Sequence, residues 1–349
     1  MWAQRAWVGT YLPAGTTPGR EFWAYSRYLT AVEGNATFYA VPHPATVTRW
    51  ADMNGNGSVD LIYADRESDD RLLAFDLGSL FSCAPAPNLM LAITNGLGRV
   101  TRIGYDPSTR FLLEDAAAGA PWPDRMPFPV TVVSSVVTDD TLGHTYVTRF
   151  QYHNGYYDPV EKQFRGFARV EQVEVGDETA PTLVTTYDFD TGRNDEAMKG
   201  KTLRKRVGLE DGRLFVDETT LWLQPSRLLY AAPDGREVHF AHPTGERQDH
   251  LELGVGTPRR TESEMAYDDY GNRTRVAEYG WVDGGDRLAG QDERITTTGF
   301  ALNLQSWILR FPHLTELADG SGKVLSRSEL FYDDETFSGT NPGIVQRGD

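Results

Sequence analysis

Hydrophobic and polar residues alternate along much of the chain after residue 52. In the segment 183–189, large side chains at every second position alternate with smaller or polar ones, which is the two-residue period of a strand with one buried face. Further short strands are expected between clusters of Gly, Pro, Asn and Asp, at 130–137, 146–152, 168–175, 203–207, 214–223 and 274–279. No helix is predicted between these strands, so the pattern indicates an all-β body.

The predicted turns are those of tight hairpins. Asp-Gly and Gly-Asn pairs, which supply the positive φ that such turns need, stand in 210–213, 233–236 and 270–272, and 320–323 is a further glycine turn. The hairpin expected over 203–222 also resembles a second one over 314–332. Repeated hairpins that cannot bury their own faces stack into a propeller or a spiralling sheet.

The first fifty residues predict a different order of elements, in which strands and helices alternate. A short apolar strand at 6–10 precedes a helical pattern at 18–30, a second strand at 31–39 and another helix start at 44–50. This β-α-β-α order is the opening of a parallel α/β sheet. The sequence therefore predicts a short α/β fragment over 1–48 that differs from the β-rich remainder.

Composition excludes several classes of protein. The 349 residues carry a formal net charge of −16, with 50 acidic and 34 basic side chains, so no nucleic-acid partner is expected. The single cysteine, Cys83, excludes an intrachain disulfide and a Cys-based zinc site. The longest uncharged run, 77–98, contains prolines and asparagines, so no direct membrane span is predicted. No signal-peptide pattern stands at the start.

The segment 52–61 is a candidate calcium loop. Oxygen ligands would come from Asp52, Asn54, Asn56 and Asp60 side chains and from the Ser58 carbonyl. Calcium prefers six to eight such oxygens. An EF-hand would need a glutamate where Tyr63 stands, so the loop is not an EF-hand. The alternative is an Asn/Gly-rich turn without metal.

Two groups of residues raise the question of catalysis. His153, Asp158 and Glu161 lie close in sequence, as an acid–base group would, but packed aromatics and a pair between Arg165 and a carboxylate are the favoured interpretation. The Glu-x-Glu segment 262–264 has the spacing found in ADP-ribosyltransferases, without the Ser-Thr-Ser strand of those enzymes. A solvated strand face is expected there, and the chain is predicted not to be an enzyme.

The order of several motifs resembles a known family. Residues 88–171 look like the middle region of bacterial insecticidal toxin-complex B subunits (TcdB type) and of SpvB-type virulence proteins. The segments that carry the resemblance are 93–98, 105–110, 126–130, 152–158 and 164–171. The loop 52–61 is similar to an FG-GAP repeat, and 267–273 is similar to one RHS/YD repeat.

This resemblance implies a fold and a role. It divides the β-rich part into an FG-GAP propeller-type segment (49–87), the toxin-complex B middle region (88–200) and an incomplete RHS/YD-like spiralling sheet of stacked hairpins (201–349). In the family, the propeller docks on a pore-forming toxin subunit and the RHS/YD repeats form a shell around a toxic cargo, the C subunit. The resemblance therefore implies a secreted or cell-surface structural component of a toxin complex.

Other expectations remain beside this one. The segment 32–42 resembles the YecE-like family of unknown function, whose Glu and Asn would fall on Glu33 and Asn35. Because only the first units of that barrel-like fold are present, we expect a frayed fragment over 1–48. The self-cleaving aspartate motif of complete RHS shells is absent and there is one YD repeat, so an internal fragment is expected. A calcium-dependent surface adhesion module and a remnant of a YecE-like enzyme fold are the alternative functions.

Overall fold

The computed structural model describes residues 48–52, 59–65, 71–75, 89–254, 257–282, 284–288, 291–332 and 345. The chain divides into two compact units, Met1–Pro87 and Asn88–Asp349. The expected α/β fragment over 1–48 lies almost entirely outside the described residues. It remains a prediction, as does the division into four regions.

The described part of the first unit is a small antiparallel sheet. Its strands are β1 (Thr48–Ala51), β2 (Asp60–Asp65) and β3 (Arg71–Phe75), in the order β1-β2-β3. In the β1–β2 pair, Ala51 lies opposite Asp60. The sheet has the antiparallel form expected of a propeller blade, but three strands do not make a propeller.

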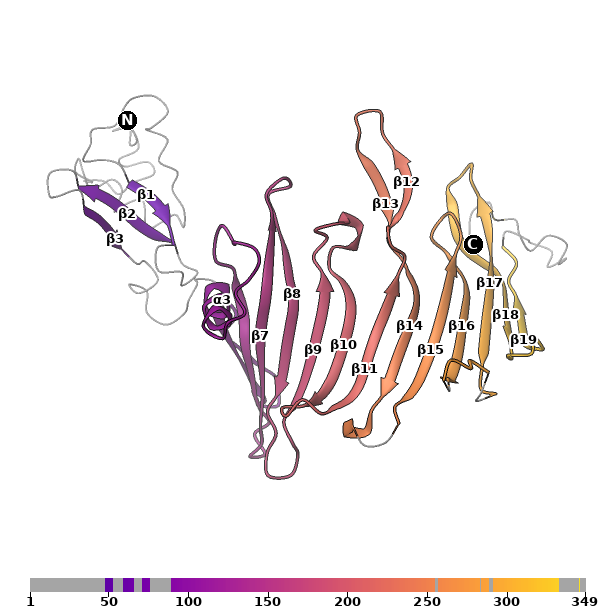
Figure 1. Ribbon diagram of the computed structural model, residues 1–349, viewed down its shortest axis with the longest axis horizontal. Helices are drawn as coiled ribbons and strands as arrows, with labels where there is room; N and C mark the ends of the chain where they lie inside the picture. Colours follow the sequence, from indigo (N-terminus) through magenta and orange to yellow (C-terminus); the bar gives the residue numbers. More distant parts are fainter. Residues whose placement is uncertain are drawn as a thin grey trace. The chain divides into compact units, whose positions relative to one another are not determined.

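A single antiparallel sheet of 14 strands dominates the second unit (Figure 1). Its strands are β4 (Ala92–Thr94), β5 (Val100–Pro107), β6 (Thr131–Asp139), β7 (Thr145–Asp158), β8 (Gln163–Glu174), β9 (Leu183–Asp190), β10 (Lys201–Leu209), β11 (Leu214–Trp222), β14 (Pro243–His250), β15 (Arg259–Tyr267), β16 (Arg273–Val282), β17 (Arg294–Asn303), β18 (Ile308–Ala318) and β19 (Val324–Glu329). Each strand pairs with the strands before and after it in this order. The expectation of a mainly β fold is confirmed.

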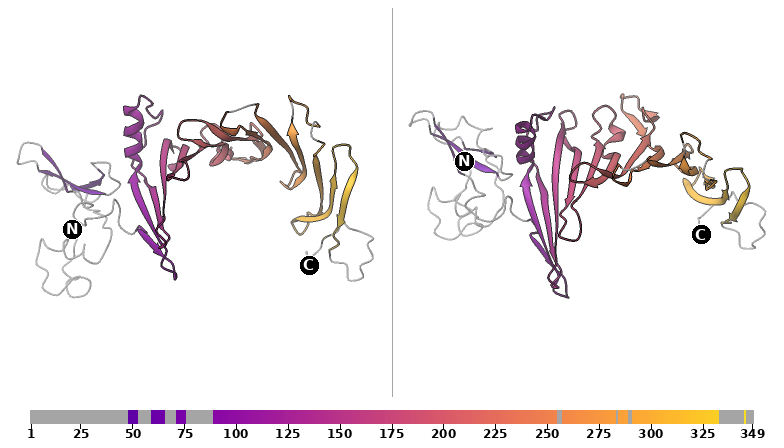
Figure 2. Two further views of the ribbon diagram at one scale, coloured as in Figure 1. Left: turned by 90° about the horizontal axis from the view of Figure 1, so that it is seen from below. Right: turned by 60° about the horizontal axis from the view of Figure 1, so that its bottom comes forward.

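The sheet is a chain of hairpins whose two ends do not meet. Its order runs from β4 at one end to β19 at the other, and Figure 2 shows that it bends along this order. The turns expected at 210–213, 270–272 and 320–323 join β10 to β11, β15 to β16 and β18 to β19. The sheet also continues through residue 200, where the sequence analysis placed a boundary between two regions.

One helix in the second unit was not predicted. The α-helix α3 (Ser108–Ala117) follows β5 directly, and Pro107 in the extended conformation stands at its start. Arg110 pairs with Glu114 at 2.9 Å, the one-turn spacing that stabilises a helix, and with Asp106 of β5 at 2.6 Å. The all-β expectation is therefore wrong at this segment, where a helix of ten residues packs on the sheet. Two short 3₁₀ helices, η4 (Glu196–Met198) and η5 (Glu252–Gly254), lie in loops.

An aromatic cluster joins α3 to the sheet. Phe111 of α3, Trp122 and Phe167 of β8 are buried, and Tyr152 of β7 packs against them. The Tyr152 and Phe167 ring centroids are 4.9 Å apart, and those of Trp122 and Phe167 are 5.9 Å apart in an edge-to-face arrangement. Such pairs add to the stabilisation from burial. This cluster fixes α3 over β7 and β8, whereas most residues of the remaining strands are only half-buried.

A two-stranded ribbon leaves the sheet between β11 and β14. Strands β12 (Arg227–Ala231) and β13 (Glu237–Phe240) pair only with each other, and the ribbon projects beyond the sheet in Figure 1. The turn expected at 233–236 joins them. At the base of the ribbon, the Ser226 backbone N–H and hydroxyl both donate to Asp195, each at 2.8 Å. These bonds tie the ribbon to the loop that carries η4.

Candidate functional site

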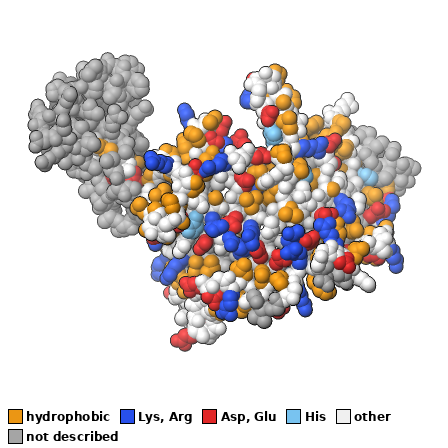
Figure 3. Space-filling view, viewed as in Figure 1, with side chains coloured by type: hydrophobic (Ala, Val, Ile, Leu, Met, Phe, Trp, Pro, Cys, Tyr) orange, Lys and Arg blue, Asp and Glu red, His pale blue; other side chains and the backbone are white. Residues whose placement is uncertain are grey.

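Arginines and carboxylates face one another across neighbouring strands of the large sheet. The pairs are Arg169–Asp188, Arg206–Asp188, Arg204–Asp217, Arg260–Asp249, Arg247–Glu262 and Arg327–Glu316. Together they form a charged ladder that extends over β8–β11, β14 and β15, with a further pair on β18 and β19. Figure 3 shows acidic and basic side chains gathered across the strands of this sheet. Positive and negative side chains alternate across the strands, so each carboxylate of the ladder lies beside an arginine guanidinium.

The centre of the ladder brings two like charges together. Asp217 of β11 lies directly opposite Asp249 of β14, an arrangement that is unfavourable between bare carboxylates. Arg204 pairs with Asp217 from one side, and Arg260 donates to both oxygens of Asp249 at 2.7 and 3.0 Å from the other. The hydrogen bond from Arg260 is the main cause that holds the pKa of Asp249 below its usual value.

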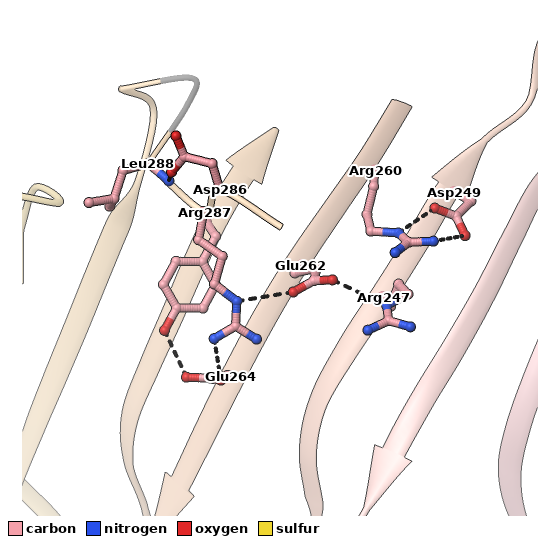
Figure 4. Close-up of polar contacts among 9 residues, drawn as sticks. Arg247, Asp249, Arg260, Glu262, Glu264, Asp286, Arg287 and Leu288 are labelled. Carbon is pink, nitrogen blue, oxygen red and sulfur yellow. Dashed lines mark hydrogen bonds and ion pairs between the residues drawn. The ribbon is translucent and has the colours of Figure 1, made fainter. Parts of the chain in front are cut away.

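A second arginine cluster lies where β14, β15 and β16 meet (Figure 4). Glu262 of β15 accepts from Arg247 at 3.2 Å and from Arg287 at 3.1 Å. Glu264 accepts from the Tyr279 hydroxyl at 2.7 Å and from Arg287 at 2.5 Å. The hydrogen bond from Tyr279, followed by that from Arg287, lowers the pKa of Glu264. Arg287, from the loop after β16, therefore fastens that loop to the sheet.

The Glu-x-Glu segment is thus part of a closed network. Only 11 % of the Glu262 side chain is exposed, so the expected solvated strand face is wrong at this residue. A hollow of about 350 Å³ lies beside the two glutamates and is also lined by Met265 and Arg275. Because Glu264 is held in its ionised form, it is not a proton donor at neutral pH. The network therefore suits a structural ion-pair cluster better than an acid–base site.

The structure separates the suspected acid–base residues near His153. The His153 Nδ1 atom contacts the Asp115 carboxylate of α3 at 2.8 Å, and the Trp122 Nε1–H donates to the same carboxylate at 2.6 Å. Asp158 instead forms an ion pair with the buried Arg165 at 2.7 Å. The favoured interpretation, a pair between Arg165 and a carboxylate, is confirmed. Sequence reasoning missed Asp115, which lies 38 positions before His153 on the helix that was not predicted.

Asp158 has a local role as well. Its Oδ1 atom accepts from the backbone N–H groups of Val160 and Glu161 at 2.8 and 3.2 Å. The bond from Glu161 is the largest cause of the lowered pKa of Asp158. Glu161 itself is exposed in the turn between β7 and β8. His153, Asp158 and Glu161 therefore do not converge on one reacting centre.

The candidate calcium loop connects β1 to β2. Asp52 and Asp60 stand at the two ends of this loop, and they lie near each other because Ala51 pairs with Asp60. Asp60 is 1 % exposed, and two carboxylates so placed fit the preference of calcium for hard oxygen ligands. Asn54, Asn56 and Ser58 lie outside the described residues, so calcium binding stays a prediction. The described part of the chain holds no cluster of three or more His, Cys, Asp or Glu side chains placed for a metal ion.

Among the described residues, no helix is both long and apolar enough to cross a membrane.

Comparison with solved structures shows which known proteins share this fold. A structure of the Photorhabdus luminescens Tc holotoxin pore matches 82 % of this chain with a TM-score of 0.63 and 18 % sequence identity. The crystal structure of TcdB2–TccC3 matches 78 % with a TM-score of 0.59 and 17 % identity, and the TcdB2–TccC3–Cdc42 structure matches 78 % with a TM-score of 0.59 and 18 % identity. The fold of the chain is therefore one found in bacterial Tc toxins.

Two family models match parts of the sequence. Residues 34–197 match the model described as the insecticide toxin TcdB middle/N-terminal region, so this part of the chain is similar to that region of TcdB toxins. Residues 1–57 match a family of proteins of unknown function, DUF72, over the part where the sequence resembles the YecE-like family. No curated protein matches the chain. It spans 18 %, 17 % and 16 % of the length of the three matched chains.

Proposed function

We propose that this chain is a non-catalytic structural component of a secreted bacterial toxin complex. In this proposal, the large sheet forms part of the wall of a shell around a toxic cargo. The first unit contributes to a propeller that docks on a pore-forming subunit. The single observation that carries the proposal is the 14-stranded sheet whose spatial order follows the chain from β4 to β19.

Such a sheet suits a wall for physical reasons. A strand order that follows the sequence can be extended by further hairpins at β19 without rearranging earlier ones, as in other repeat architectures. The charged ladder pairs neighbouring strands with one another, so the carboxylates of the ladder are neutralised within the sheet. Its carboxylates are thereby occupied in holding strands together, which supports a structural role rather than a catalytic one.

The partners in this proposal are proteins. The matched structures contain TcdB2 together with TccC3, and one also contains Cdc42. By analogy, we infer that this chain associates with a companion subunit that carries the toxic cargo and with a pore-forming subunit. With 50 acidic and 34 basic residues, the chain is poorly suited to nucleic acid, which also favours protein partners.

The proposal is tested on the native assembly. A tagged copy of this chain, expressed in its source bacterium, would be purified from the culture medium and from cells, and its particles imaged by electron microscopy. A hollow particle with a mass several times the 39.0 kDa of this chain is expected. A free 39.0 kDa chain that stays inside the cells and carries no other protein would overturn the proposal.

A further inference from the structure

A hollow of about 470 Å³ lies beside the end of β7, away from the charged ladder. Three segments meet there: the loop between α3 and β6, the last residues of β7 and the link between β9 and η4. Its apolar lining includes Pro127, Tyr156 and Tyr157. Proline and tyrosine side chains are stiff and lose little conformational entropy on binding, so this lining suits a rigid extended ligand.

The walls of this hollow are held in place before any ligand arrives. The Arg193 guanidinium lies over the Tyr156 ring, 4.9 Å from its centroid, and forms an ion pair with Asp124. On the other side, the Tyr157 and Phe128 rings pack edge to face with centroids 5.4 Å apart. Both tyrosines are therefore oriented by neighbours from other segments, and a ligand need not order them.

Three residues of the lining have polar groups without a partner among the residues that the structure describes, and each of these groups can donate a hydrogen bond. Within the described part of the chain, the hydroxyls of Tyr156 and Tyr157 and the guanidinium of Arg125 make no hydrogen bond or ion pair. Asp124 is the one carboxylate of the lining, and Arg193 already occupies it. Arg125 is a cation that can only donate, and both tyrosine hydroxyls can donate, so a ligand with hydrogen-bond acceptors and a negative charge suits the hollow.

We propose that this hollow binds an extended, proline-containing peptide segment of a partner protein, with an acidic residue that pairs with Arg125. A polyproline II segment has no internal hydrogen bonds, so its carbonyls are free to accept from tyrosine hydroxyls. Its proline rings pack on tyrosine faces, as in other aromatic grooves that bind proline-rich peptides. A neutral sugar would stack on the tyrosines as well, but it would leave the Arg125 guanidinium without a counter-charge.

The direct test is fluorescence anisotropy of the purified full chain with a labelled peptide that contains a Pro-Pro-x-Pro pattern and one glutamate. Saturable binding is expected. Binding should fall at least about fivefold when the glutamate becomes lysine or when Arg125→Ala removes the cation, as for the loss of one charge-assisted hydrogen bond. The exposed Arg259 makes no ion pair within the described residues, so Arg259→Ala is the matched control and should bind as the wild type does.

A second variant tests the tyrosines without removing their rings. The double variant Tyr156→Phe/Tyr157→Phe keeps the contacts with Arg193 and Phe128, and it should weaken binding about tenfold through the lost donors. Circular dichroism melting of each variant checks that the fold is kept. Equal binding of a peptide with every proline replaced by alanine, absence of saturable binding, or tighter binding of maltohexaose than of the peptide would overturn the proposal.

Discussion

Asp217 and Asp249 stand directly opposite each other on β11 and β14, and each is neutralised by an arginine from the strand on its far side. The two carboxylates can share the middle of the sheet only because Arg204 and Arg260 flank them. The pairing of β11 with β14 is also the place where the sheet resumes after the projecting ribbon. These four side chains thus help to hold together the two halves of the sheet.

Removal of one flanking arginine should weaken this junction. Arg260→Met keeps most of the aliphatic stem but leaves Asp249 facing Asp217 without its guanidinium. Because the Arg260 side chain is 40 % exposed, solvent screens the effect, and a loss of about 1 kcal/mol in the free energy of unfolding is expected. Urea unfolding measures it. The double variant Arg260→Met/Asp249→Asn should recover part of the loss.

The control for this prediction is Arg236→Met in the β12–β13 turn. Arg236 pairs with Asp234, but its side chain is 86 % exposed, so the variant should unfold like the wild type. If Arg236→Met and Arg260→Met destabilised the chain equally, the junction would have no special role.

Acid should destabilise the chain through one carboxylate of the charged ladder and one of the second arginine cluster. The pKa values of Asp249 and Glu264 are lowered in the folded chain, by the hydrogen bonds from Arg260 and from Tyr279 respectively. The unfolded chain therefore binds protons first, near the ordinary values of about 3.9 for Asp and about 4.3 for Glu. Stability is fully present above these values and is lost as the pH falls through the lower folded pKa values.

The measurement is urea unfolding from pH 6 down to pH 3 for the wild type, Asp249→Asn and Glu264→Gln. Each variant should lose less stability over this interval than the wild type. The decline of the general repulsion from a net charge of −16 is nearly the same in all three, so it cancels in the comparison. Parallel curves for all three proteins would contradict the prediction.

The strands and hairpin turns could be predicted from the sequence because their signals are local. The alternation in 183–189 and the Asp-Gly pair in 210–213 depend on neighbours along the chain, and β9 and the β10–β11 turn follow. The helix α3 depends on tertiary contacts of Phe111. The helix has only ten residues, and no side chain caps its N-terminus with a hydrogen bond. Its sequence therefore carries few of the local features by which a helix is predicted.

The candidate site was harder to predict for a related reason. Which carboxylate meets which arginine depends on the register between strands, and register is not encoded within one strand. Glu262 meets Arg247 because β14 pairs with β15, and it meets Arg287 because a loop folds back. The same holds for Asp115 and His153, which α3 brings together across 38 positions. Of these ion pairs, only the one between Arg165 and a nearby carboxylate could be predicted from the sequence.

Gly155 of β7 should be sensitive to the addition of one methyl group. A Cβ at this position would lie 2.8 Å from the Trp122 ring and 3.3 Å from the Phe167 ring. Gly155→Ala should therefore force the aromatic cluster apart and cost about 1–3 kcal/mol. Chemical denaturation followed by tryptophan fluorescence measures the change. Gly96→Ala is the control, because nothing lies within 4 Å of its Cβ, and a wild-type stability for both variants would contradict this account of the cluster.

The edge strand β19 should make the isolated chain self-associate. All six residues of β19 are exposed, and within the described residues it pairs with β18 alone. Unpaired edges of this kind join other strands. Leu325→Lys should reduce the concentration-dependent association seen by analytical ultracentrifugation, whereas Leu142→Lys, at an exposed loop position, should not. A chain that is monomeric at every concentration would contradict this account of the β19 edge.

Calcium binding at the β1–β2 loop is the last prediction. If Asp52 and Asp60 hold the ion together with Asn54, Asn56 and the Ser58 carbonyl, calcium at 100 times its dissociation constant should stabilise the folded chain by about 2.7 kcal/mol. Differential scanning fluorimetry in calcium and in magnesium measures the shift of Tm. Asp52→Asn should abolish the calcium shift, and Asp319→Asn, which alters a turn aspartate of the second unit, should keep it. Since magnesium demands a stricter octahedral geometry than calcium, an equal shift with both ions would indicate general screening of the acidic surface, and the absence of any shift would remove the site and the calcium-dependent adhesion alternative with it.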